Sequence, residues 1–170
     1  MTANFKRLAV VMVLSCAAVG CQSHTANQTA PASGASGTTG AAKRIDACSM
    51  LSPQDISKVL GVTVQGKSTG KDPQMGDCSW ENPSTLESIT LQISNPGTAR
   101  NNTLPAPQAG IPNLSKPGPD GMRLMGGGTV EFAAGNRVNT VQVAVLKLSS
   151  DQANSAAIDL ARKISPQVPN

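Results

Sequence analysis

The sequence is poor in the side chains that most often carry chemistry. Its 170 residues include one Trp, two Phe, no Tyr and a single His, at position 24. So few aromatic rings leave few surfaces on which bases or sugars could stack. Because no His follows His24, residues 25–170 cannot form a Ser-His-Asp triad or an activated Cys–His pair. We therefore expect a protein that is not an enzyme, with no catalytic residues and no cofactor.

A strong excess of one charge is also missing. The chain has 14 Lys and Arg residues against 10 Asp and Glu residues, a formal net charge of +4. Two of the basic residues, Lys6 and Arg7, lie in a targeting segment, and the remainder is close to neutral. A basic face for nucleic acid is therefore not indicated, and we expect no nucleic-acid partner.

The N-terminus has the pattern of a secretory signal peptide. Lys6 and Arg7 precede the apolar run Leu8–Val19, and Gly20 and Cys21 follow it directly. As a helix the run would be about 18 Å long, which is too short for a hydrocarbon core of about 30 Å. The pattern therefore predicts export rather than a transmembrane helix.

Residues 18–21 (AVGC) resemble a bacterial lipobox, in which cleavage precedes a Cys that becomes acylated. We predict a lipoprotein signal peptide at 1–20 and a lipidated Cys21 that holds the protein on a membrane. In a host with two membranes, Gln22 favours the periplasmic face of the outer membrane. Two alternatives stay open: lipidation at Cys16, or an ordinary signal peptide.

A flexible tether is predicted after the lipidation site. Residues 22–42 are mostly Ser, Thr, Gly and Ala and carry no formal charge, and His24 among them is interpreted as inert. Such a composition cannot bury enough apolar surface to fold. About twenty flexible residues span roughly 25 Å, enough to hold a domain clear of lipid head groups. We place that single domain at residues 43–170.

Two helices are predicted in this domain. Ser52 is a helix cap with Pro53 in the first turn, and Gly61 ends the helix. The second helix begins after Ser149 or Ser150 and ends before Pro166. Its apolar face recurs at helical spacing and consists of Ala153, Ala157, Leu160, Ala161 and Ile164.

Strands are predicted between the helices. Apolar residues alternate with polar ones in 88–94, 129–132 and 141–145, and Gly135-Asn136 favours a tight hairpin. Residues 100–120 are rich in Pro and predict a surface excursion, which Ile111 and Leu114 are expected to pin to the core. The order predicts an α+β fold: an antiparallel sheet of about four to six strands, packed by an N-terminal and a C-terminal helix.

Cys48 and Cys78 are the cysteines that remain once the N-terminal segment is removed and Cys21 is acylated. Two cysteines in an exported domain predict one disulfide. Two thiolates with no His cannot complete a four-ligand metal site without carboxylates, so no metal site is expected.

Three further patterns have structural explanations. Residues 61–68 (GVTVQGKS) match a phosphate-binding loop, but a helix precedes the string and 62–64 favours a strand, so no nucleotide is expected. Gly126–Gly128 is interpreted as a turn between strands. Asp77 and Glu81, the least implausible carboxylate pair, are interpreted as solvated surface acids.

The cysteine motifs resemble a known family. Residues 46–56 (DACSMLSPQDI), then VLG at 59–61 and CSW at 78–80, are similar to DUF3558, a family of small secreted bacterial lipoproteins without established activity. Met50 stands where Leu is commoner. The resemblance implies a disulfide between Cys48 and Cys78 and a lipid-anchored position in the cell envelope.

These observations lead to two functional hypotheses. The first is a non-enzymatic module that binds a partner protein in the envelope, for example as an inhibitor or immunity protein. The alternative is a carrier of a small apolar ligand or lipid. Besides these two, an envelope hydrolase that uses Asp77 or Glu81 is a third hypothesis.

Overall fold

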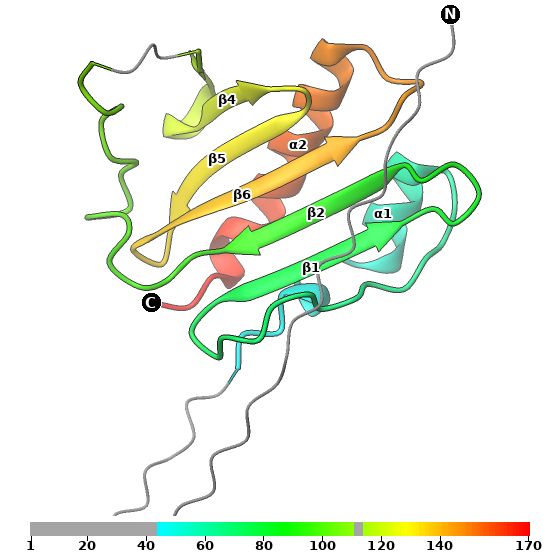
Figure 1. Cartoon of the computed structure of the whole chain (residues 1–170), viewed down its shortest axis with the longest axis horizontal. Coiled ribbons are helices and arrows are strands. Elements are labelled where there is room, and N and C mark those ends of the chain that lie inside the picture. The colour runs from blue at the N-terminus through cyan, green and yellow to red at the C-terminus, as the bar shows by residue number, and fades with distance from the viewer. Residues whose placement is uncertain (1–43, 111–113) are drawn as a thin grey trace, which may run out of the picture. The chain divides into compact units, whose positions relative to one another are not determined.

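The computed structural model describes residues 44–110 and 114–170. The signal peptide, Cys16, Cys21 and the tether are predictions that lie outside the described residues. Within these ranges six strands form one antiparallel sheet (Figure 1), which confirms the expected α+β composition. In sheet order they are β1 (Gly76–Glu81), β2 (Ser88–Ile93), β6 (Arg137–Ala144), β5 (Thr129–Ala134), β4 (Arg123–Gly126) and β3 (Lys116–Pro117).

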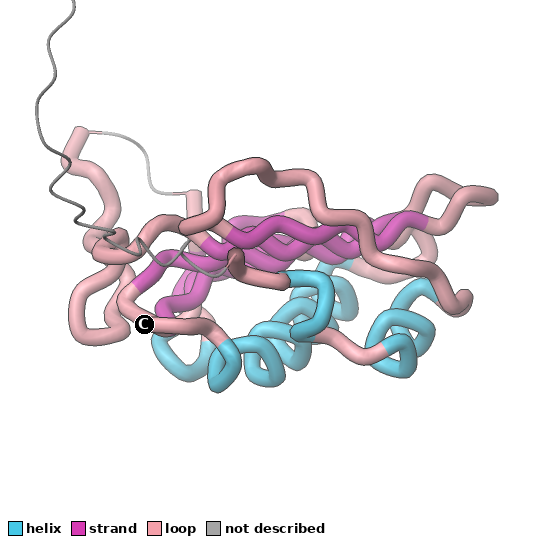
Figure 2. The backbone as a smooth tube through the Cα atoms, turned by 90° about the horizontal axis from the view of Figure 1, so that it is seen from below, coloured by secondary structure: helices cyan, strands magenta, loops and turns pink. Residues whose placement is uncertain are grey.

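The strand register gathers the apolar side chains on one face of the sheet. Cys78 on β1 pairs with Leu91, which pairs with Val141, which in turn pairs with Val130. Paired residues point to the same face, so these side chains form a continuous buried row. Both helices lie on the same side of the sheet (Figure 2) and share one hydrophobic core with it.

Helix α1 (Pro53–Leu60) begins and ends as predicted. The Ser52 side chain accepts a hydrogen bond from the Asp55 amide, and the Asp55 carboxylate accepts one from the Ser52 amide. This reciprocal capping box satisfies two amides that the first helical turn leaves free. Gly61 ends the helix with φ of 75°, a left-handed conformation that glycine adopts without steric cost.

Helix α2 (Ser150–Ile164) closes the fold and continues into a short 3₁₀ turn (Ser165–Gln167). Ser149 is its cap, in a second capping box with Gln152. The helix buries the predicted apolar face against the sheet, namely Ala153, Ala157, Leu160, Ala161 and Ile164.

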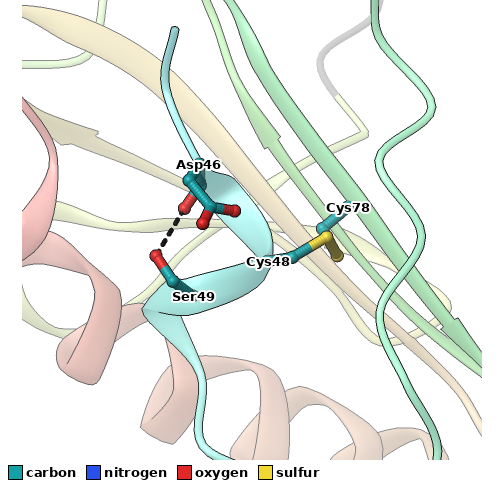
Figure 3. Close-up of a disulfide and its surroundings, with 4 residues drawn as sticks. All are labelled: Asp46, Cys48, Ser49 and Cys78. Carbon is teal, nitrogen blue, oxygen red and sulfur yellow. Dashed lines mark hydrogen bonds between the residues drawn. A yellow bond between two sulfur atoms is a disulfide. The ribbon is translucent and has the colours of Figure 1, made fainter. Parts of the chain in front are cut away.

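The predicted disulfide is present. Cys48 lies on the 3₁₀ turn η1 (Ala47–Met50) and bonds to Cys78 on β1, with 5.1 Å between the Cα atoms (Figure 3). Gly66 packs closely against the disulfide: a Cβ there would lie 2.6 Å from the Cys78 sulfur and 2.7 Å from Trp80 Nε1. The bridge therefore joins the start of the domain to the edge strand of the sheet, under a loop that has no room for a side chain at Gly66.

Three local expectations need correction. Residues 62–64 form no strand; the extended pairing comes later, where Lys67 bridges to Ser79 on β1. The excursion contains the short strand β3. Leu114 does not pin this segment, because its side chain is 87% exposed, and Ile111 lies outside the described residues.

A buried arginine ties three distant segments together. The Arg137 side chain donates hydrogen bonds to the carbonyl oxygens of Pro169 (3.0 Å), Gln74 (2.6 Å) and Ser94 (2.7 Å). It is 5% exposed, and burial lowers the pKa of its guanidinium group below the ordinary value for arginine. The C-terminal tail, the loop before β1 and the end of β2 therefore meet at one guanidinium group.

Candidate functional site

The patterns singled out in the sequence do not converge on a reaction centre. Asp77 and Glu81 lie four residues apart on β1, which in an extended strand separates their Cα atoms by about 13 Å. Asp77 is partly buried, and Glu81 is exposed. At that backbone separation, the strand does not bring the two carboxyl groups together as a glycosidase site would need.

The phosphate-loop string also lacks its required setting. Gly61 is the cap of α1, so a helix rather than a strand precedes the string. The backbone of Lys67 is hydrogen-bonded to the backbone of Ser79, and no helix follows at Ser68. The amides of the string are therefore not placed around a helix N-terminus, as phosphate binding needs.

Gly126 ends β4, and Gly127 and Gly128 form the turn to β5, as expected. All three residues have positive φ, and a Cβ at Gly128 would lie 2.3 Å from the Val143 carbonyl oxygen and 2.9 Å from the Ala153 Cβ. Glycine is required there because the turn passes so close to β6 and α2.

The described residues contain neither a cluster of metal ligands nor a membrane-spanning helix. Across residues 44–110 and 114–170, no three His, Cys, Asp or Glu side chains cluster in a way that could hold a metal ion. In the same ranges, no helix has the length and apolar character needed to cross a bilayer.

A cavity lies at one end of the sheet, where three connections meet. They are the β1–β2 turn, the β4–β5 turn and the segment between β6 and α2, all at the same end in Figure 1. The cavity has a volume of about 430 Å³, within the range of small-ligand sites. Its lining includes Leu86, Glu87, Gly127, Val145, Leu146 and Ala153.

Glu87 is the charged residue of this cavity. Its side chain is largely buried, with 8% exposed. One carboxylate oxygen accepts a hydrogen bond from the Leu146 amide at 2.9 Å, and the other accepts one from the Thr85 hydroxyl at 3.0 Å. Among the described residues, no Lys or Arg forms an ion pair with Glu87. The carboxylate thus joins two loops through neutral donors only.

Two exposed leucines stand at the mouth of the cavity. Leu86 is 72% exposed and Leu146 is 89% exposed. Leu86 has φ of 60°, a conformation that is rare for a bulky L-residue. Its amide donates to the Asn82 carbonyl at 2.8 Å, and the Asn82 amide donates to the Glu87 carbonyl at 2.8 Å. The turn therefore exposes the apolar side chain of Leu86 to solvent, and the backbone of this residue is strained.

A smaller hollow of about 170 Å³ lies between the two helices. Asp55 and Lys163 form an ion pair across it, and Lys58 and Asp159 also line it. The hydrogen bond from Lys163, followed by those from Ser52, lowers the pKa of Asp55 below 3.8. Because Asp55 also belongs to the capping box, this group serves to join the helices.

Sequence reasoning missed Glu87 and Leu86 as site residues. Glu87 lies one residue before β2, in a stretch of ordinary turn composition, and nothing local marks it as buried. One signal was available. The apolar residues of 141–145 occupy odd-numbered positions, whereas Leu146 occupies an even-numbered one, and this change indicates a strand end there. An apolar residue directly after a strand end is a candidate for exposure.

A comparison with protein-family models, curated proteins and solved structures finds no match to this chain. The resemblance to secreted lipoproteins therefore stays a prediction that depends on the two cysteine motifs.

Proposed function

We propose that this protein is a lipid-anchored protein of the bacterial cell envelope whose α+β domain is a non-enzymatic binding module. Cys21 would carry the lipid, and residues 22–42 would link it to the domain. The partner would be another envelope protein or an incoming one, and an inhibitor or immunity role fits this arrangement. Contact would be made at the cavity end of the sheet.

The observation that carries this proposal is the display of Leu86 and Leu146 at the cavity mouth. Leu86 lowers the stability of the fold in two ways: its apolar side chain is exposed to water, and its left-handed backbone conformation is strained. Aliphatic side chains around a hollow are typical of interaction surfaces, which bury such groups on association. The Glu87 hydrogen bonds hold both loops in place before binding, which lowers the entropic cost of association.

A carrier of a small apolar ligand is the second candidate function. It is favoured by the size of the cavity, about 430 Å³, and by the apolar side chains of Val143, Val145, Leu148 and Ala153 in its lining. In that case the leucines would form the entrance rather than the contact surface.

Site-specific photocrosslinking in living cells tests the proposal. A photoreactive amino acid replaces Leu86 or Leu146 in the full chain, and the same replacement at Leu114 is the matched control. Leu114 is also exposed, at 87%, but lies on the excursion before β3. We expect one discrete protein adduct from positions 86 and 146 and none from 114.

The outcomes separate the candidates. Adducts of equal yield from all three positions, or none from positions 86 and 146, would contradict a protein-binding surface. A lipid mass that co-purifies in native mass spectrometry, without a protein adduct, would favour the carrier. Incorporation of labelled palmitate that persists in Cys21→Ala would reject the lipidation site.

A further inference from the structure

We propose that the cavity recognises a lysine side chain flanked by apolar residues on the partner protein, with Glu87 as the counter-ion. This inference rests on the proposed function and names the chemistry of the partner at the same site. Its basis is the buried carboxylate of Glu87, which pairs with no Lys or Arg of the described residues, beside the two exposed leucines.

The Glu87 carboxylate can accept hydrogen bonds from a further donor. Glu87 is 8% exposed and is hydrogen-bonded by the Leu146 amide and the Thr85 hydroxyl, both neutral. A carboxylate has about four acceptor positions, so capacity for further donors remains. An ammonium group can donate three hydrogen bonds and supplies the missing charge.

The nearest basic residue on these loops does not serve this purpose. Lys147 follows Leu146 directly, but its ammonium lies beside Gly61, where an added Cβ would be 3.1 Å from Nζ. A cation at the C-terminal end of α1 is stabilised there by the helix dipole. Among the described residues, the ion pairs leave Glu87 without a cation.

A partner that covers the two leucines also changes the surroundings of Glu87. A partner that packs on Leu86 and Leu146 removes the remaining solvent from Glu87, because both leucines line the same cavity as that carboxylate. A purely apolar partner would then bury an unpaired charge, which is strongly unfavourable. A partner with a cation between apolar groups avoids this penalty.

The lining of the cavity favours lysine as the source of the cation. Val145 and Ala153 in its lining can pack along an alkyl chain, and Glu87 can meet the head group. Lysine has a four-carbon stem with a compact terminal charge, which suits an apolar wall that leads to one carboxylate. The flanking apolar side chains of the partner would then rest on the exposed leucines.

Peptide binding tests this assignment. The full chain in nanodiscs of zwitterionic lipid is titrated calorimetrically with acetyl-Ala-Leu-Lys-Leu-Ala-amide, and with the same peptide carrying norleucine in place of Lys. We expect the Lys peptide to bind at least about tenfold more tightly than the norleucine peptide. The difference should shrink as salt is raised, because ionic strength screens the charge. Neither measurement needs a variant protein.

Glu87→Gln provides the second test, since glutamine keeps an acceptor for the Leu146 amide but loses the charge. We expect this substitution to weaken the binding of the Lys peptide at least about tenfold and to leave the affinity for the norleucine peptide unchanged. Glu81→Gln, an exposed acid on the same hairpin, is the control and should keep the wild-type affinity. Equal affinity of the two peptides, or equal loss in both variants, would overturn the inference.

The two proposals can fail separately. A crosslinked protein at positions 86 and 146 with no preference for the Lys peptide would reject the lysine chemistry alone. A Lys preference that depends on Glu87, without any crosslinked protein, would reject the protein partner and keep the chemistry of the cavity.

Discussion

Replacing Arg137 tests how the fold is held together at the end of the sheet away from the cavity. Its guanidinium donates to the carbonyl oxygens of Pro169, Gln74 and Ser94, at 3.0, 2.6 and 2.7 Å. Arg137→Met keeps a long apolar stem but removes all three donors. The three acceptors come from segments 32, 63 and 43 residues away in the chain, so the loss affects the tertiary structure rather than one element.

The magnitude follows from the acceptors left behind. A carbonyl that loses its donor in a partly buried site costs about 1 kcal/mol or more. Three such groups give an expected decrease of about 3 kcal/mol in the free energy of unfolding. Burial lowers the pKa of Arg137, which indicates that its charge is poorly solvated. Removal of that charge recovers part of the loss, so a decrease well above 3 kcal/mol is not expected.

Urea denaturation monitored by Trp80 fluorescence measures the change, and native-state hydrogen exchange locates it. We expect faster exchange in the loop before β1 and in the C-terminal tail, where the carbonyls of Gln74 and Pro169 lie. Arg137→Lys should fall between wild type and Arg137→Met, because one ammonium cannot span three carbonyls as the guanidinium fork does. Arg100→Met, at an exposed arginine, is the control. A wild-type urea midpoint in Arg137→Met would refute the reasoning.

Three further predictions concern other contacts. The double variant Cys48→Ala/Cys78→Ala should lose about 3 to 4 kcal/mol of unfolding free energy, as the loop-entropy estimate gives for a separation of 30 residues; thermal unfolding that matches the oxidised wild type would contradict it. Asp55→Asn should be less stable than wild type at neutral pH by about 1 kcal/mol. Because the folded-state pKa of Asp55 lies below 3.8, that difference should vanish as the pH falls through the lowered value, and urea titrations at several pH values would reveal a difference that persists. Leu86→Asn should raise stability by about 1 kcal/mol, because Asn tolerates positive φ, whereas a less stable variant would show that the turn is not strained.

Local sequence signals predicted most of the secondary structure. Ser52 and Gly61 mark the ends of α1, and the alternation in 88–94 marks β2, because caps and strand faces depend on residues close in the chain. The error at 62–64 has a physical cause. Those β-branched residues favour extended backbone, but Gly61 turns the chain away from the sheet, and the nearest pairing with β1 begins at Lys67.

The candidate site was much less predictable. Leu86 and Leu146 lie sixty residues apart in the chain. They line one cavity only because the β1–β2 turn and the C-terminal end of β6 lie at the same end of the sheet. Leu114 shows the converse, since an apolar residue that was expected to pack on the core is exposed. Exposure of a single apolar residue depends on its distant neighbours.

The sequence by itself determined the two capped helices, the antiparallel alternation, the pairing of Cys48 with Cys78 and the absence of any His after residue 24. Each of these follows from composition or from neighbours within a few residues. Only the tertiary structure decided that Glu87 is buried and pairs with no cation of the described residues, that Arg137 joins three segments, and that two leucines near one cavity are exposed. Those properties depend on strand order and register, which bring together residues far apart in the chain.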